Sequence, residues 1–330
     1  MKRTIAVIVT YNRHSLLVDC IEAIRAQTIS PHEILVVNNG SADYTSVWLD
    51  NQTDIKHIYQ ENSGSAGGYH AGINYAYTQG YDFVWCMDDD GYPAKDALEK
   101  LLQNTSESPV LLNSAVIDKY DKHSFVFKTK KYNSIHQVKE SSINGIAHPF
   151  NGTLIDRSII SIAGLPDAYL FNKGAETEYL NRITEKFNIP AKTITQSVHF
   201  HPPVISYNKE WDLKSNGSMY FMLRNQYQAN VSKYKYKPIA IMFYLGFIYS
   251  FIFSIIKTQK SDKSKKISIS LLAGFDAMAN NYSASPASIQ QKINRQYNSS
   301  SLVILLTSVR QFILSVFVPS YSILQKATSY

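Results

Sequence analysis

Four apolar runs, each followed by a polar loop, dominate residues 4–90 of the chain. The runs are TIAVIVT (4–10), EILVVNN (33–39), KHIYQE (56–61) and YDFVWCMDDD (81–90). Apolar residues at helical spacing lie between them, most clearly in SLLVDCIEAIRAQ (15–27) and YHAGINYAYTQG (69–80). This alternation of strands and helices predicts an α/β fold, in which a mostly parallel, Rossmann-like sheet has helices on both faces.

Each of these runs ends in a loop that is rich in polar residues or glycine. The loops are TYNR, NNGSAD, NSGSAGG and DDDGYP. The carboxyl ends of parallel strands meet at one edge of a sheet, and ligands bind in the crevice at that edge. We therefore expect the loops to converge on a binding site.

Three consecutive aspartates, Asp88, Asp89 and Asp90, end the fourth run. Residues i and i+2 of a strand point to the same side, so Asp88 and Asp90 can hold one cation while Asp89 faces elsewhere. Carboxylate oxygens suit Mg²⁺ or Mn²⁺. The alternative is a solvated turn in which one aspartate caps the helix predicted in PAKDALEKLL, but that explains only one of the three charges.

The middle of the chain alternates less regularly. Residues 104–150 are polar and mixed, and we expect irregular strands and loops there. FNGTLIDRSIISIAGLPD (150–167) predicts a strand and a short helix, AETEYLNRITEKF (175–187) a helix, and AKTITQSVHFH (191–201) a strand. We place the end of the α/β domain at residue 230.

Residues 231–330 are predicted to be helical and apolar. PIAIMFYLGFIYSFIFSII (238–256) has no charge and is long enough to span a bilayer. KTQKSDKSKK (257–266) holds five lysines, and SLVILLTSVRQFILSVFVPSYSI (301–323) is again apolar. The region is either a helical bundle packed within the protein or a membrane-associating part. We favour the second, lying on an anionic membrane surface rather than spanning it.

The net charge indicates the kind of partner, and the cysteine content indicates the compartment. The formal net charge of +7 indicates an anionic partner. We do not expect nucleic acid, because the lysines gather in 257–266 without interleaved aromatic residues. The two cysteines, Cys20 and Cys86, form no disulfide framework and fit a reducing cytoplasm.

Taken together, the motifs resemble those of family 2 glycosyltransferases, which have the GT-A fold. The resemblance covers residues 4–225 and rests on IVTYNR, ILVVNNGSAD, ENSGSAGGYHAG, WCMDDDGYP, GAETEYLNR and MYFMLRN. It is strongest with the branch that contains bacterial galactofuranosyl- and rhamnosyltransferases of surface polysaccharides. It implies a metal-dependent transferase that uses a nucleoside diphosphate sugar.

The same resemblance assigns the donor site. It gives Asp88 and Asp90 to Mn²⁺ or Mg²⁺, and Asp89 to the sugar or ribose. The donor-binding residues that it implies are Thr10, Tyr11, Asn12, Asn39, Asn62, Gly67, Gly68, Asp88, Asp89 and Arg224. The glycines would let the backbone approach the donor closely. The family usually has an aspartate where this chain has Asn38, which leaves the preferred base open, and Arg224 could equally cap the end of the domain.

Glu176, Glu178 and Glu185 are the candidate catalytic bases on the helix at 175–187. Glu178 has Arg182 four residues on, which predicts a helix-surface ion pair and leaves Glu176 free. The family motif also places its base at Glu176, where a carboxylate can take the proton of an acceptor hydroxyl. The alternative role for Glu176 is a negative charge favoured by the helix N-terminus.

His199 and His201 alternate on the strand at 191–201 and so share a face. In the resembled family a histidine beyond the base completes the metal shell, and both residues fit that spacing. We favour His199, because the proline pair after His201 indicates a structural turn.

The sequence therefore predicts an inverting glycosyltransferase at the inner face of the cell membrane, cytoplasmic and peripheral. Its expected acceptor is a lipid-linked or growing surface glycan. The resemblance favours UDP-galactofuranose as donor. The alternatives are dTDP-rhamnose as donor, or a catalytically silent, membrane-attached protein that only binds nucleotide sugars.

Overall fold

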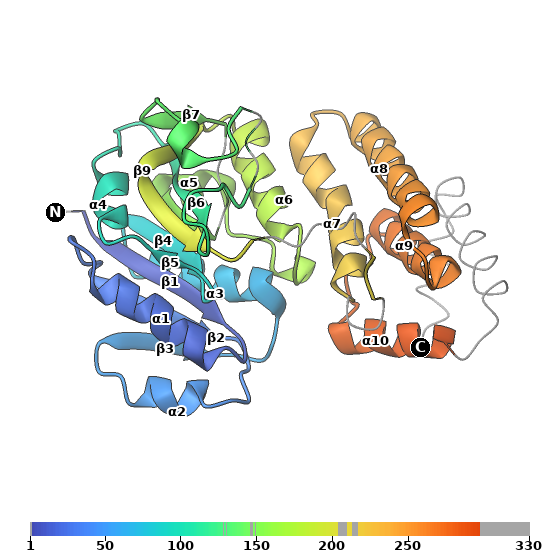
Figure 1. Cartoon of the computed structure of the whole chain (residues 1–330), viewed down its shortest axis with the longest axis horizontal. Coiled ribbons are helices and arrows are strands. Elements are labelled where there is room, and N and C mark those ends of the chain that lie inside the picture. Colours follow the sequence, from blue (N-terminus) through green and yellow to red (C-terminus); the bar gives the residue numbers. More distant parts are fainter. Residues whose placement is uncertain are drawn as a thin grey trace. The chain divides into compact units, whose positions relative to one another are not determined.

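The computed structural model describes residues 2–127, 129, 131–145, 148, 150–203, 210–212 and 217–297 (Figure 1). It divides into two compact units. The α/β unit comprises residues 1–168 and 179–204, and the helical unit comprises residues 169–178 and 205–330. The sequence placed this boundary at residue 230. The structure instead assigns α7 (Ser218–Lys233) to the helical unit, because it packs against α8 (Lys237–Thr258) and α9 (Lys263–Met278).

A single sheet forms the centre of the α/β unit. Its strands, within the described residues, are β1 (Thr4–Thr10), β2 (Glu33–Asn38), β3 (Ile55–Tyr59), β4 (Phe83–Asp88), β5 (Tyr92–Pro93), β6 (Leu111–Asp118), β7 (Ser142–Asn144), β8 (Asn151–Asp156) and β9 (Ala191–His201). They are ordered β3-β2-β1-β4-β8-β6-β9-β5, and β7 pairs with β9. The strands β3, β2, β1 and β4 run parallel, as predicted, and so do β6 and β9, whereas β8, β5 and β7 pair antiparallel with their neighbours.

Helices cover both faces of this sheet (Figure 1). Alternate residues of β1 point to opposite faces, so Val7 joins one core and Ile8 the other. The first core includes α3 (Gly64–Thr78) and α5 (Arg157–Ala163). The second includes α1 (His14–Arg25), α4 (Ala97–Leu102) and part of α2 (Thr45–Asp50). The near-continuous apolar strands follow from burial on both faces.

Strand β6 lies within residues 104–150, where the sequence predicted irregular strands and loops but did not locate this strand, because its middle is polar. Asn113 and Ser114 are fully buried there and find partners on neighbouring strands. Asn113 Nδ2 donates to the carbonyl of Asn151 at 2.8 Å and to Thr153 Oγ1 at 3.0 Å, and Ser114 Oγ lies 2.8 Å from Ser197 Oγ. Paired in this way, buried polar groups are tolerated within a sheet.

The helical predictions after residue 150 are confirmed in position. A helix begins as α6 (Ala175–Asn181) and continues as a π-helical segment over Arg182–Lys186. The apolar run at 238–256 lies in α8, and α9 and α10 (Pro286–Tyr297) follow it. The predicted apolar segment at 301–323 lies outside the described residues.

Helix α8 is apolar on two sides. Ala240, Tyr244 and Ile248 are buried in the core that α8 shares with α7 and α9. Large apolar side chains remain exposed along the rest of the helix: Ile239, Met242, Phe243, Tyr249, Phe253 and Ile256. Among the described residues it is the one helix long and apolar enough to cross a membrane, and 22% of its most apolar stretch is buried in the structure.

Both cysteines lie in the core of the α/β unit. Cys20 of α1 and Cys86 of β4 are fully buried and unpaired. Burial, together with the nearby aspartates, raises the pKa of both thiols.

Candidate active site

The parallel pairing of β1 and β4 brings the aspartates to the polar loop after β1. Val9 pairs with Asp88, so Thr10 lies beside the aspartates that follow β4. Thr10 Oγ1 donates to Asp89 Oδ2 at 2.8 Å. The predicted convergence of these two loops at the carboxyl edge of the sheet is therefore confirmed for Thr10 and the aspartates.

A cluster of two carboxylates and one imidazole lies at this edge. Ligand atoms of Asp88, Asp90 and His201 are all within 4.8 Å of one another. His201 Nε2 lies 3.3 Å from Asp90 Oδ1, a buried atom that has no hydrogen-bond partner among the described residues. We call Asp88, Asp90 and His201 the acidic cluster.

The tautomer of His201 is fixed by the chain that follows it. Its Nδ1 lies 2.7 Å from the carbonyl oxygen of Pro202, which can only accept, so Nδ1 carries the proton. In the neutral imidazole Nε2 then presents a lone pair toward Asp90 Oδ1, so their 3.3 Å approach needs either a proton on Nε2 or a cation between the two atoms. Oxygen and imidazole donors in this arrangement fit Mn²⁺ or Mg²⁺.

The surroundings of the two acids in the cluster shift their pKa values in opposite directions. Burial, with the nearby charge of Asp90, raises the pKa of Asp88 to about 7. For Asp90 the burial effect is outweighed by His201, Arg13 and Lys119, so its pKa is lowered. The pKa of His201 is raised because Asp90 and Asp88 outweigh its burial. The site thus concentrates negative charge that a cation would stabilise.

The structure places His201, rather than the favoured His199, in the acidic cluster. His199 is fully buried, and its ring packs where a Cβ on Gly91 would meet Nε2 at 2.4 Å. Burial lowers the pKa of His199 to about 3, and neither ring nitrogen has a hydrogen-bond partner among the described residues. The proline pair that counted against His201 instead orients it, through the Pro202 carbonyl.

Two cations beside the aspartates were not singled out from the sequence. Arg13 Nη1 lies 3.0 Å from Asp89 Oδ1 and 2.9 Å from Asp90 Oδ2. Lys119 Nζ donates to the carbonyl of Asp90 at 3.3 Å. Arg13 belongs to the TYNR motif, so its position there was the available signal. Lys119 gave none, because it follows the unrecognised strand β6.

Asp88 is held from the other side by residues that the sequence also left unassigned. Tyr69 Oη donates to Asp88 Oδ1 at 2.8 Å, and Asn151 Nδ2 donates to Oδ2 at 3.3 Å. The Tyr69 ring stacks on Phe150 with 3.9 Å between centroids. Asp89 is buried, with one oxygen bonded to Thr10 and the other to Arg13. The carboxylates of Asp88 and Asp89 are therefore both held in place.

The predicted asparagines connect the loops at this edge. Asn12 Oδ1 accepts from the backbone of Ala42 at 2.7 Å. Asn39 is buried, and its Nδ2 donates to the carbonyl of Gly64 at 3.0 Å. Asn62 Oδ1 accepts from the Gly64 amide at 3.0 Å. Tyr11 differs from these residues, since 45% of it is exposed.

The glycines of NSGSAGG lie in a helix rather than in a loop. Helix α3 begins at Gly64, so Gly67 and Gly68 are in its first turns. A Cβ on Gly68 would lie 2.4 Å from Val9 Cγ1, and one on Gly67 would lie 2.2 Å from Ser63 Oγ. Gly68 therefore allows α3 to pack closely against β1, and Gly67 leaves room for the Ser63 side chain at the start of the helix. Neither role depends on the predicted approach of these glycines to the donor.

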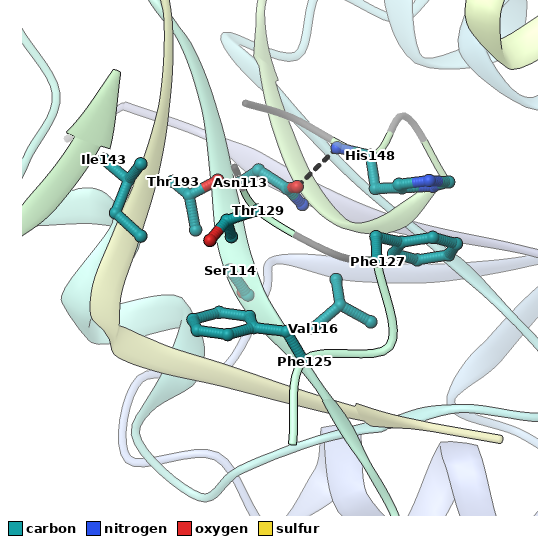
Figure 2. A pocket seen from close by; sticks show the side chains of 9 residues that line it. All are labelled: Asn113, Ser114, Val116, Phe125, Phe127, Thr129, Ile143, His148 and Thr193. Atoms are coloured by element: carbon teal, nitrogen blue, oxygen red, sulfur yellow. Dashed lines mark hydrogen bonds between the residues drawn. The ribbon is translucent and has the colours of Figure 1, made fainter. Parts of the chain in front are cut away.

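A small cavity lies beside β6 and β9 (Figure 2), and the ring of Phe127 in its lining has its centroid 6.2 Å from that of His201. It is lined by Asn113, Ser114, Val116, Phe125, Phe127, Thr129, Ile143, His148 and Thr193. Figure 2 shows the rings of Phe127 and His148 stacked at one side, with the His148 amide bonded to Asn113 Oδ1. Its volume of about 20 Å³ is that of one water molecule, so it cannot accept a sugar nucleotide.

Glu176 and Arg224 belong to the helical unit. Glu176 is half-buried, and the Gly174 amide donates to its Oε2 at 3.2 Å. Glu178 is buried and accepts from Ser232 Oγ at 2.7 Å. Arg224 is fully buried and donates to the carbonyl of Leu170 at 3.1 Å.

Comparisons with known proteins agree with this geometry. The family model described as Glycosyl transferase family 2 matches residues 5–160. Galactofuranosyltransferase GlfT1 of Mycobacterium tuberculosis is 30% identical over 212 residues, which cover 60% of this chain and 69% of that protein. The chain belongs to glycosyl transferase family 2. It is therefore a glycosyltransferase, as the sequence predicted.

Other proteins match a shorter part of the chain or the fold alone. Poly-beta-1,6-N-acetyl-D-glucosamine synthase of Staphylococcus aureus is 30% identical over 105 residues, covering 31% of this chain and 25% of that protein. The crystal structure of S. aureus TarS 1-349 in complex with UDP superposes with a TM-score of 0.51 at 13% identity. It covers 90% of this chain and 91% of that chain, which confirms the predicted GT-A fold.

The family match covers only part of the candidate site. Thr10 and the three aspartates lie within residues 5–160. Glu176, His201 and Arg224 lie beyond it, so their assignment depends on their surroundings in this structure.

Proposed function

We propose that this family 2 glycosyltransferase transfers galactofuranose from UDP-galactofuranose to a glycan acceptor, with inversion at the anomeric carbon. The observation that carries the proposal is the acidic cluster at the carboxyl edge of the sheet. The choice of sugar is supported by the relative from M. tuberculosis, which is named a galactofuranosyltransferase. The glycan is proposed to be part of a bacterial surface polysaccharide.

Asp88, Asp90 and His201 would hold Mn²⁺ or Mg²⁺. When bound, the ion supplies positive charge that stabilises the diphosphate leaving group. Arg13 adds a second cation at the same edge, half-exposed and already paired with Asp89 and Asp90. Thr10, Arg13, Tyr69 and Asn151 hold the aspartates in place, so the charges are preorganised before a donor binds.

Glu176 is the proposed base. It takes the proton from an acceptor hydroxyl while that oxygen forms a bond to the anomeric carbon of the donor sugar. The bond from that carbon to the diphosphate oxygen breaks in the same step, and the nucleoside diphosphate departs. Glu178 is a weaker candidate, because it is buried and accepts a hydrogen bond from Ser232.

The donor site is proposed to extend from the acidic cluster over the ends of β1 and β2. The residues assigned to it are Thr10, Tyr11, Asn12, Asn39, Asn62, Gly67, Gly68, Asp88 and Asp89. Tyr11 is exposed at this edge and could stack on a base. The asparagines have hydrogen bonds of their own, so they would act mainly by fixing the loops around the donor.

The acceptor is proposed to be lipid-linked, with the enzyme lying on the inner face of the membrane. One face of α8 is buried against α7 and α9, while its exposed stripe is apolar and includes Met242 and Phe253. Exposed lysines flank the helix at both ends: Lys233, Lys235, Lys237, Lys257 and Lys260. A helix packed on one side suits the membrane surface better than a span, and the lysines would meet anionic headgroups.

The first test is a panel of sugar nucleotides incubated with Mn²⁺, with release of the nucleoside diphosphate as the readout. We expect UDP-galactofuranose to be consumed by the wild type in the presence of a galactofuranose-bearing lipid acceptor, and EDTA to stop the reaction. Consumption of dTDP-rhamnose instead would change the assigned sugar. Binding without turnover of any donor would favour the catalytically silent alternative.

The base is tested by Glu176→Gln, with Glu178→Gln as the matched control. Loss of a general base typically lowers turnover by about 10²–10⁴-fold, which we expect for Glu176→Gln only. UDP affinity should be unchanged in both variants. Full turnover in Glu176→Gln would show that another group is the base.

The membrane assignment is tested by flotation of the full chain with vesicles of phosphatidylcholine and phosphatidylglycerol. We expect co-flotation that weakens when Met242→Ser and Phe253→Ser are combined. The same substitutions at the buried Tyr244 and Ile248 are not suitable controls, because they would unfold the helical unit. A wild type that stays with the soluble fraction would exclude this docking.

A further inference from the structure

The loop that leads into α6 has a strained backbone. Phe171 and Lys173 have positive φ angles of 65° and 24°, and Gly174 has a φ of 95°. A non-glycine residue with positive φ persists only when its surroundings impose that conformation. Glu176 follows two residues after this loop, so whatever holds the loop also fixes the start of the helix that carries Glu176.

The side-chain amide of Asn225, on α7, holds the loop through the backbone carbonyl groups of the loop. Its Nδ2 lies 2.8 Å from the carbonyl oxygen of Leu170, 2.6 Å from that of Asn172 and 2.9 Å from that of Lys173. Asn225 is fully buried, and a Cβ on Gly174 would come within 3.0 Å of its Cβ. The loop therefore closes tightly around one amide group.

Arg224 sets the orientation of that amide. Its Nε donates to Asn225 Oδ1 at 3.1 Å, and its Nη2 donates to the Leu170 carbonyl at 3.1 Å. A guanidinium only donates, so the atom that it contacts must be the Asn225 oxygen, and the amide nitrogen must face the loop. Phe171 also stacks on Phe221 of α7, with ring centroids 5.2 Å apart.

We propose that Arg224 and Asn225 are positioning residues that fix Glu176 by clamping the loop at 170–174. This inference rests on the proposed function, in which Glu176 is the base. It replaces donor binding as the role of Arg224, whose guanidinium is fully buried and bonded within its own unit. A base displaced by even 1 Å loses much of its effect, so the clamp sets the rate of transfer rather than the affinity for the donor.

The test is Asn225→Asp, which keeps the size of the side chain and its contact with Arg224 but removes both N–H donors. Its matched control is Asn230→Asp, the same change at a buried asparagine on the same helix, whose Nδ2 points to the Ala240 carbonyl. We expect kcat to fall about 100-fold in Asn225→Asp with donor KM changed about 2-fold or less, and about 3-fold or less in the control. Equal effects of the two changes would overturn the clamp.

A double-mutant cycle with Glu176→Gln separates positioning from general stability. If Asn225 acts through Glu176, Asn225→Asp should lower the residual rate of Glu176→Gln by about 2-fold or less. The same factor in both backgrounds would overturn the inference. Arg224→Gln, which frees Asn225 Oδ1 but keeps Asn225, serves if Asn225→Asp does not fold, and the same cycle applies with an expected loss of about 10-fold.

The two failures can be told apart. Full turnover of Glu176→Gln itself would remove the base from the proposed function. If Glu176→Gln is inactive and Asn225→Asp lowers kcat no more than Asn230→Asp does, the proposed function stands and only the clamp is overturned.

Discussion

His201 and His199 lie two residues apart on β9, yet the ring of His201 contacts a carboxylate while the ring of His199 is fully buried among other groups. His201 presents Nε2 to Asp90, while its Nδ1 is oriented by the next carbonyl. His199 is buried against Gly91 and Gly152, with its pKa lowered to about 3 by that burial. One imidazole faces a carboxylate of the acidic cluster, and the other is packed against glycines in the interior.

The same contrast separates two layers of the site. The ligand layer is the acidic cluster of Asp88, Asp90 and His201, so called after the metal proposed for it, and it concentrates charge at the edge of the sheet. The support layer, formed by His199, Gly68 and Gly91, is buried or closely packed in the α/β unit, and Tyr69 links the two layers through its hydrogen bond to Asp88. Substitutions in the ligand layer should remove activity and spare stability, and substitutions in the support layer should do the reverse. Four predictions test this separation, from the largest effect to the smallest.

Asp90→Asn should cause the largest loss. The change removes one charge from the acidic cluster, so turnover should fall about 1000-fold, as when a principal electrostatic group is removed. The free energy of unfolding should change by about 1 kcal/mol or less, because relief of repulsion with Asp88 offsets the lost pairing with Arg13 and His201. Turnover and chemical denaturation measure the two quantities. A variant that loses stability but keeps turnover would reverse the assignment of the layers.

The histidines should separate metal affinity from stability. His201→Ala removes a ligand atom and should weaken Mn²⁺ binding about 100-fold, with little change in unfolding. His199→Ala leaves a cavity and should lower the free energy of unfolding by about 2–4 kcal/mol while Mn²⁺ affinity changes little. Calorimetric Mn²⁺ titration and urea denaturation of both variants are the measurements. Weaker Mn²⁺ binding in His199→Ala alone would restore His199 as the ligand.

Gly68→Ala should reduce stability through overpacking. The added Cβ would lie 2.4 Å from Val9 Cγ1 on a central strand, so the free energy of unfolding should fall by about 1–3 kcal/mol. Gly246→Ala is the matched control, since it also lies within a helix but has no atom within 4 Å of the new Cβ. That control should be neutral or stabilising by up to about 1 kcal/mol. Equal losses would mean that helix α3 is not held closely against β1.

Tyr69→Phe should have the smallest effect and should affect both layers. It removes only the hydroxyl that donates to Asp88 Oδ1, so kcat should fall about 3- to 10-fold and stability by about 1 kcal/mol. Tyr179→Phe, in the same core with its hydroxyl on the Gly164 carbonyl, controls for loss of a buried tyrosine hydroxyl. An activity loss in the control as large as in Tyr69→Phe would show that Asp88 does not depend on Tyr69.

The sequence predicted the parallel half of the sheet because burial on both faces makes its strands apolar throughout. It also predicted that Thr10 and the aspartates meet, since that follows from strand order alone. It failed where polar groups satisfy one another inside the fold. Asn113 and Ser114 obscured the position of β6 within a stretch predicted as irregular strands and loops, although their partners lie on β8 and β9.

Other errors came from giving a local meaning to residues whose role is tertiary. Gly67 and Gly68 suggested a loop, but they lie in α3, and Gly68 allows that helix to approach Val9. The proline after His201 suggested a structural turn, but its carbonyl orients the imidazole. Tyr69 and Lys119 reach the aspartates from distant elements, and nothing in their local sequence indicates it.

The two buried cysteines allow the opening of one part of the molecule to be timed separately. Cys20 and Cys86 are the only thiols in the sequence, and both are sealed in the α/β unit with raised pKa values. A thiol must be exposed and ionised to react, so an alkylating reagent can label the chain only when that unit opens. The rate of labelling then reports how often the sheet and its acidic edge open, and it does not respond to motion confined to the helical unit.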